Sequence, residues 1–392
     1  MSAERKRNLQ FHILQALFWC GYCTLSTYAT AWFLSIGLSS TAISLMMAVS
    51  MIVSFAGQLF WGGVCDKKSS NKRVFIGCFI LTVGLTCVIS ESLLHRNRIG
   101  FFLYPVMAFF SSSLATNLDA WENHCFRNTN HSIGVSRGCA ALAYSLFHFF
   151  YARAVANTEY RIIPFAAVFF CVLVVLFAMF TPSVKEEKNG FVLCEEQKNT
   201  TADFLGNRNY WGLLVIIFLV GLGTGPLSSM KVLLYEEVGK SVSFLGVDSL
   251  FTSGIQIPLF FLGEMFGKIH ADRRLLWGGV ILSVSSCVLV LASSPILMLL
   301  GNTAIAAAYP FILLSIRDIV REQMPAGLQT TANGICDAIY GSISGIAAML
   351  YTGRVVDQYG IRMLVVISLL AYLLSTALIV GRYSRRKILR HS

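Results

Sequence analysis

Residues 181–208 read TPSVKEEKNGFVLCEEQKNTTADFLGNR, a polar, charge-rich stretch that separates two series of apolar runs. The whole chain, in contrast, is only 13% charged and 55% hydrophobic over 392 residues. Soluble domains carry about a quarter charged residues, which they need to cover their surface. The composition therefore predicts a polytopic membrane protein, divided by this one polar stretch.

Six apolar runs of membrane-spanning length precede the polar stretch and six follow it, at about 20 residues for each helix. The predicted spans are residues 11–36, 43–64, 74–91, 100–120, 138–156, 162–180, 210–234, 247–266, 275–292, 297–316, 331–352 and 361–380. We therefore expect an all-α fold of twelve transmembrane helices in two pseudo-symmetric six-helix bundles. The bundles would be residues 1–181 and 210–392, joined by a cytoplasmic linker, 182–209.

The basic residues predict the orientation. With both termini inside, the inner segments hold 23 Lys and Arg and the outer segments 8, which accounts for all 31. This bias places both termini in the cytoplasm of a multi-pass plasma (inner) membrane protein. The same spread argues against nucleic acid as a partner, since no single face or tail collects the net charge of +11.

A charged loop follows the second predicted span. Gly62, Asp66 and Lys67 precede Lys72 and Arg73 in it. A glycine four residues before an acid lets two helices approach while the acid reaches a neighbouring helix end. A simple charged turn that obeys the inside bias of Lys and Arg would explain the same residues.

Asp119 closes the fourth predicted span, Arg137 opens the fifth, and Tyr144 follows seven residues later. Seven residues are nearly two helical turns, so Arg137 and Tyr144 share a face, which His148 joins at i+4 from Tyr144. Ionisable groups at the edge of a span are costly unless they are paired or face water. They can form a structural ion pair, or they can bind hydroxyl groups while the tyrosine covers an apolar sugar edge.

Together these segments resemble the major facilitator superfamily, whose loop between helices two and three reads G-x-x-x-D-[RK]-x-G-[RK]-[RK]. The second glycine is absent here and the loop is longer. The eighteen residues from Asp119 to Arg137 and the seven to Tyr144 resemble the oligosaccharide:proton symporter branch (lactose permease-like, MFS_1-like). The resemblance implies that Asp119 and Arg137 hold a sugar on which Tyr144 stacks, in place of the usual Trp.

The second half resembles the same branch over segments 221–237, 256–258, 273–276, 329–334 and 353–360. Gly221, Gly223 and Gly225 lie within a span, so we expect helix packing there and no nucleotide site. The acid on helix VIII of the branch corresponds to Gln256, which we expect to contact the solute. The branch's proton-handling residues on helices IX and X correspond to Ser285, Ile305 and Ala308, so that set is missing.

Asp337 lies about 9 Å inside the eleventh predicted span, at 1.5 Å per residue from Thr331. An acid within a membrane is a functional candidate, and a buried carboxylate without a fixed cation can take up a proton near neutral pH. We expect Asp337 to carry the coupling proton, with Asp119 as second choice. A bond to Lys231 or to the backbone would make Asp337 a structural anchor instead.

The sequence thus favours a monomeric secondary active transporter that moves a sugar, oligosaccharide or nucleoside together with a proton by alternating access. One alternative is drug or metabolite efflux by the same fold, through a cavity lined by aromatic and Met side chains. Another is a transporter-like sensor that binds solute without moving it. The sequence lacks a nucleophile–base or metal-ligand cluster, so we expect no enzyme activity, no metal and no cofactor. The expected partners are the lipid bilayer, the solute and a proton.

Overall fold

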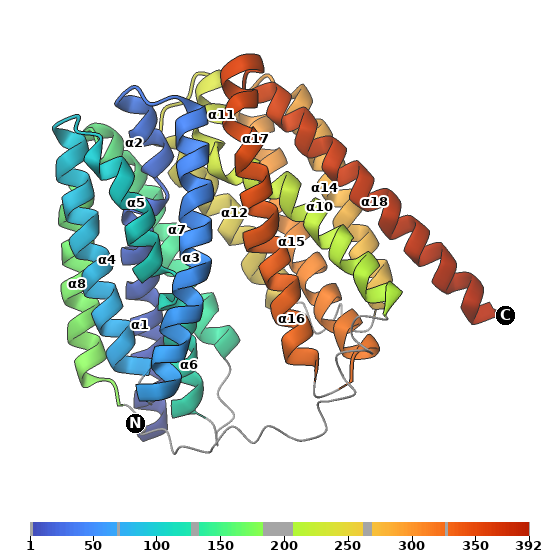
Figure 1. The fold of residues 1–392 in the computed structure, drawn as a ribbon, viewed down its shortest axis with the longest axis horizontal. Coiled ribbons are helices and arrows are strands. Elements are labelled where there is room, and N and C mark those ends of the chain that lie inside the picture. Colours follow the sequence, from blue (N-terminus) through green and yellow to red (C-terminus); the bar gives the residue numbers. More distant parts are fainter. Residues whose placement is uncertain are drawn as a thin grey trace. The chain divides into compact units, whose positions relative to one another are not determined.

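The computed structural model describes residues 3–68, 71–126, 133–182, 207–261, 269–325 and 328–391, and all regular structure in these ranges is helical (Figure 1). The chain divides into two compact units. Unit 1 contains residues 1–190 and 241–250, and unit 2 contains residues 191–240 and 251–392.

Within its described residues, unit 1 contains eight helices, coloured blue to green in Figure 1, and the first residues of a ninth. Helix α1 packs against α7 and α8, while α4 packs against α5, α6 and α8. The eight helices are α1 (Ala3–Ser26), α2 (Ala29–Ser35), α3 (Ser40–Lys68), α4 (Asn71–Leu94), α5 (Ile99–Ser111), α6 (Leu114–Cys125), α7 (Ile133–Asn157) and α8 (Ile162–Phe180).

Unit 2 holds the remaining helices, coloured light green to red in Figure 1. Helix α14 packs against α15 and α18, and α10 packs against α17 and α18. The helices are α10 (Arg208–Ser229), α11 (Lys231–Glu237), α12 (Phe244–Phe261), α14 (Ala271–Leu291), α15 (Pro295–Gln323), α16 (Gln329–Ala338), the π-helix η3 (Ile339–Ile343), α17 (Ser344–Tyr359) and α18 (Ile361–His391). Residues 244–250 of α12 belong to unit 1.

Ten helical segments within the described residues are long and apolar enough to cross a membrane, fewer than the twelve expected. The first predicted span, 11–36, is not one helix, because α1 ends at Ser26 and α2 begins at Ala29. The predicted span 247–266 falls on α12, whose apolar segment is shorter, and residues 262–268 lie outside the described ranges. The all-helical membrane architecture is confirmed, whereas the number of spans is not.

Three predicted spans are interrupted at hydroxyl-rich positions: α1–α2 at Ser26, α5–α6 after Ser111, and α10–α11 after Ser229. At each break, serine hydroxyls donate to carbonyls three or four residues earlier, as Ser26 does to Tyr22, Ser112 to Phe109 and Ser229 to Pro226. Such bonds compete with the backbone ladder and bend helices. Interrupted helices are the elements from which transporters build solute sites.

Candidate functional site

Asp119 on α6 and Arg137 on α7 form the expected ion pair in unit 1. Arg137 Nη2 donates to Asp119 Oδ2, with the Asp119 side chain 18% exposed and that of Arg137 60% exposed. Exposed ion pairs contribute about 1 kcal/mol or less to stability. The pair therefore adds little to the stability of the contact between α6 and α7. The exposed guanidinium of Arg137 is suited to directional hydrogen bonds with a ligand.

A polar network surrounds this pair, and sequence reasoning missed most of it. Gln15 on α1 donates from Nε2 to Asp119 Oδ1 and to Glu122 Oε2, at 3.0 Å in each case. Glu122 Oε1 also accepts from the Ser136 hydroxyl, which lies 2.6 Å from His12 Nδ1. Glu122 follows Asp119 by three residues, so one helical turn places both acids on one face, a signal that the sequence does contain.

Tyr144 and His148 lie further along α7, in an aromatic cluster. The His148 ring is buried, 4.9 Å from the Tyr144 ring centroid and stacked 5.1 Å from the Tyr28 ring between α1 and α2. The shared face of Tyr144 and His148 is thus as predicted. The expected set nevertheless falls into two groups on α7: the Arg137 ion pair, and an aromatic cluster about 10 Å further along at 1.5 Å per residue.

The loop after α3 differs in part from its prediction. Among the described residues, no atom lies within 4 Å of a Cβ placed on Gly62, so the close helix approach expected there is absent. It occurs at Gly57, where a Cβ would lie 2.5 Å from the Phe109 carbonyl oxygen of α5. The side chains of Asp66 and Lys67 lie outside the described residues, and Arg73 is exposed at the start of α4.

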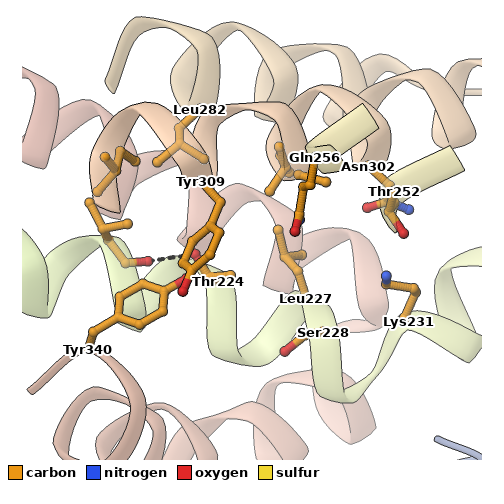
Figure 2. Close-up of a pocket in the computed structure, with 14 residues that line it drawn as sticks. Thr224, Leu227, Ser228, Lys231, Thr252, Gln256, Leu282, Asn302, Tyr309 and Tyr340 are labelled. Atoms are coloured by element: carbon orange, nitrogen blue, oxygen red, sulfur yellow. Dashed lines mark hydrogen bonds between the residues drawn. The ribbon is translucent and has the colours of Figure 1, made fainter. Parts of the chain in front are cut away.

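Unit 2 contains a cavity of about 360 Å³, shown in Figure 2. Two tyrosine rings lie at one end and Lys231 with Thr252 and Asn302 at the other (Figure 2). Gln256, predicted from the sequence, is half-buried between these ends. The residues that line the cavity are Val220, Thr224, Leu227, Ser228, Lys231, Thr252, Gln256, Leu282, Asn302, Ile305, Ala306, Tyr309, Ile312 and Tyr340.

Two glycines allow α10, which forms one wall of the cavity, to pack closely against α18 and η3. A Cβ on Gly223 would lie 2.6 Å from the Tyr372 ring of α18, and one on Gly221 would lie 2.6 Å from the Tyr340 carbonyl oxygen of η3. The packing role predicted for these glycines is confirmed. Thr224, next in the chain, lines the cavity, and its hydroxyl hydrogen-bonds the Tyr372 hydroxyl at 3.0 Å.

Tyr309 and Tyr340 were not predicted as site residues. Tyr309 comes from α15 and Tyr340 from η3, and their ring centroids are 5.9 Å apart. Because Tyr309 lies among apolar residues on its span, a search for ionisable groups passes over it. π-Helical segments are frequent at functional sites, but no sequence signal located η3.

Asp337 has a fixed cation, contrary to expectation. Arg317 Nη2 donates to both carboxylate oxygens of Asp337, at 2.9 and 2.7 Å, and the Asp337 side chain is 55% exposed. The premise of an enclosed carboxylate without a cation is therefore wrong. Asp337 joins α16 to α15, as a structural anchor does, although the partner is neither Lys231 nor the backbone.

Further ion pairs join α14, α15 and α18. Arg274 donates to Asp318, which also pairs with Arg321 at 3.2 Å. Asp272, nearly fully buried, accepts from Arg382 Nε at 2.9 Å. Within the described residues, no group of three or more His, Cys, Asp and Glu side chains is placed to hold a metal ion.

A sequence model of the MFS_1 like family matches residues 9–363 of the chain. No curated protein sequence gives a significant match.

Solved transporter structures share the fold. A crystal structure of a mutant of the nucleoside transporter NupG aligns with a TM-score of 0.77 and 15% identity, over 96% of this chain and 99% of that one. A bacterial homologue of the human lysosomal transporter Spinster aligns with a TM-score of 0.71 and 12% identity, over 98% of both chains. The human organic anion transporter MFSD10 (TETRAN) aligns with a TM-score of 0.64 and 15% identity, over 97% of this chain and 100% of that one.

Proposed function

The chain belongs to the MFS_1 like family of major facilitator superfamily transporters, and we propose that it moves a small hydroxylated solute, a sugar or nucleoside, with a proton. The distribution of Lys and Arg supports cytoplasmic termini, and the proposed location is the plasma (inner) membrane. The resemblance to the symporter branch supports alternating access by a monomer.

The unit 2 cavity carries the proposal. Ligand pockets run from about 300 to 1,000 Å³, so a volume of about 360 Å³ suits one small ring compound better than a bulky drug. The faces of Tyr309 and Tyr340 can cover a nucleobase or the apolar edge of a sugar. Amide and hydroxyl groups, from Gln256 and Thr224 among others, can both donate hydrogen bonds to solute hydroxyls and accept them.

Unit 1 supplies a second set of candidate solute contacts. In line with the resemblance, we assign Asp119 and Arg137 to hydroxyl groups, and Tyr144 with His148 to an apolar ring edge. The loop residues Gly62, Asp66, Lys67 and Arg73 are proposed to act in the conformational change.

Efflux of an apolar compound is the second candidate, and a cavity in unit 1 favours it. This cavity, about 210 Å³, is lined among others by Met47, Met51 and Met107 with Tyr22 and Tyr104. Flexible Met side chains and aromatic rings adapt to varied apolar ligands. The small volume argues against it as the principal site.

The test is uptake by the purified chain in liposomes. We expect tritiated uridine, glucose or lactose to accumulate when the outside is acidic, and accumulation to disappear when a protonophore removes the gradient. Tyr340→Ala should strongly lower uptake of the transported probe, whereas Tyr359→Ala, at a tyrosine 69% exposed in the same unit, should not.

The alternatives give different results in the same liposomes. Efflux of an apolar dye that Met107→Ala lowers and Tyr340→Ala leaves unchanged would favour the unit 1 cavity. Saturable binding of uridine or a sugar, without uptake or counterflow, would identify a sensor and contradict the transport proposal.

A further inference from the structure

Glu122 is a fully buried carboxylate in the polar network of unit 1. Its exposed fraction is 0%, as is that of Ser136, and Gln15 is 1% exposed. Trp121, next in the chain and 2% exposed, packs edge-on against Phe11 of α1 at 5.3 Å. Because Glu122 is fully buried, proton exchange at this carboxylate needs a path through protein groups.

The hydrogen bonds to Glu122 provide such a path. Because the Ser136 hydroxyl donates to Glu122 Oε1, its oxygen accepts a hydrogen bond from the Nδ1–H of His12, 2.6 Å away. A hydroxyl that accepts one hydrogen bond and donates another can pass a proton along the chain. His12 is half-buried, and so nearer to solvent than Glu122.

We propose that Glu122 is a proton-binding site that is loaded from His12 through the Ser136 hydroxyl. In the transfer, the Nδ1–H bond of the His12 imidazolium breaks as a new O–H bond forms on Ser136. The original Ser136 proton moves to Glu122 Oε1. The products are a neutral imidazole and a neutral carboxylic acid, so atoms and charge balance.

Gln15 links this site to the candidate solute-binding pair. Its Nε2 carries two hydrogens and contacts one acid with each, Asp119 and Glu122, both at 3.0 Å. Protonation of Glu122 removes one of the two negative charges that share this amide. Asp119 then remains the only charged acceptor of Gln15, and the strength of its pairing with Arg137 changes.

Among the described residues, the titratable and charged groups at the Glu122 end of α6 and of the helices near it include Arg7 and His12 (α1), Cys65 (α3), Lys72 (α4), Asp119, His124 and Cys125 (α6), and Arg137 (α7). Arg7 lies over the Phe126 ring at 5.0 Å and Lys72 over the Trp121 ring at 5.4 Å. His12, Asp119 and Arg137 reach Glu122 through hydrogen bonds. The pairing among these three groups should therefore change when Glu122 takes up a proton.

The inference deepens the proposed proton-coupled transport and rests on it, but its test needs no solute. Purified protein in liposomes is examined by infrared spectroscopy as the difference between acidic and alkaline buffer. We expect a protonated-carboxyl band that Glu122→Gln removes. The exposed Glu91→Gln, at a side chain 70% exposed, should leave that band in place. Persistence of the full band in Glu122→Gln would overturn the proposal.

The relay is tested by variants that keep Glu122, which also covers a failure of Glu122→Gln to fold. After a rapid drop in pH, the carboxyl band should appear more slowly in Ser136→Ala than in wild type, and at a nearly normal rate in Ser136→Thr. His12→Gln should slow it as Ser136→Ala does. Unchanged rates in Ser136→Ala and His12→Gln would show that protons reach Glu122 by another route and overturn the relay.

Failures of the two proposals are distinguishable. Lack of uptake of uridine, glucose and lactose by wild type, with the Glu122 band present, counts against the proposed solute alone. Proton-driven uptake that survives unchanged in Glu122→Gln, with the band unaltered, counts against the inference alone.

Discussion

Tyr309 and Tyr340 pack against each other at one end of the unit 2 cavity, with ring centroids 5.9 Å apart and planes inclined by 34°. Tyr309 is on the regular helix α15, whereas Tyr340 is on the π-helical segment η3. A π-turn inserts one residue into a helix and so re-aims the side chains on it. The direction of the Tyr340 ring thus depends on η3, whose Tyr340 carbonyl accepts a bond from the Ser344 hydroxyl.

Removing the Tyr340 ring should weaken binding of a transported nucleoside. Stacking of a base on an aromatic side chain contributes about 1–3 kcal/mol, which is the loss expected for Tyr340→Ala with uridine. Tyr340→Phe keeps the ring and should bind nearly as well. Calorimetric titration measures both. Equal affinities for wild type and Tyr340→Ala would remove this ring from the site.

A methyl group on Gly221 should disturb the cavity by displacing η3, the segment that holds Tyr340. Its Cβ would meet the Ser344 side chain and the Tyr340 carbonyl oxygen, so η3 must shift. Overpacking of this kind costs about 1–3 kcal/mol, and Gly221→Ala should lower the melting temperature and weaken solute binding together. Gly212→Ala, on the same helix with no described atom within 4 Å of the new Cβ, is the matched control and should be harmless.

The membrane fold was predictable because apolar span length is a strong signal, and ten predicted spans match apolar helices. The break at Ser26 was not predicted, since hydropathy averages over the whole of 11–36 and the competing hydroxyl bonds are local. The same holds for the end of α10 at Ser229, within predicted span 210–234.

The candidate site was predictable only where spacing on one helix or across one loop determines contact. Asp119 with Arg137, and Tyr144 with His148, are such cases. Tyr309 and Tyr340 meet through the packing of separate helices and the π-turn of η3, which no spacing reveals. The Arg317 partner of Asp337 was not predicted, because it comes from another helix, α15.

The buried pair of Arg382 and Asp272 should matter more for stability than an exposed pair. Their side chains are 10% and 2% exposed, and losing one partner of a buried pair costs about 3–5 kcal/mol. Arg382→Ala should therefore lower the free energy of unfolding by about 3 kcal/mol in denaturant titrations in detergent, since His270 still contacts Asp272. Arg362→Ala, which breaks a half-exposed pair with Glu237, should cost about 1 kcal/mol or less. Similar losses in both would refute the distinction.

Replacing Arg137 with Lys should affect solute binding more than folding. Lysine keeps the charge but lacks the planar fork of the guanidinium, so binding of the transported probe should weaken by about 1–3 kcal/mol. The unfolding free energy should change by less than about 1 kcal/mol, because the pair is exposed. If Arg137→Lys and Tyr144→Ala both bind the probe like wild type, unit 1 does not contact the solute through these residues.

Asp337→Asn separates a proton carrier from a structural anchor. Because Arg317 holds both oxygens of Asp337, we expect an anchor: the variant should keep proton-driven accumulation in liposomes and lose about 1 kcal/mol or less of stability, as for other half-exposed pairs. Arg317→Gln should behave alike, since it breaks the same pair from the other side.

A carrier would respond differently to the same substitution. Asparagine cannot take up and release a proton, so the variant would lose accumulation against a gradient yet retain counterflow exchange, in which no net proton movement is needed. That pattern in Asp337→Asn, with normal accumulation in Arg317→Gln, would return the coupling role to Asp337. Normal accumulation in both variants would leave the coupling proton to the acids of unit 1, Asp119 and Glu122.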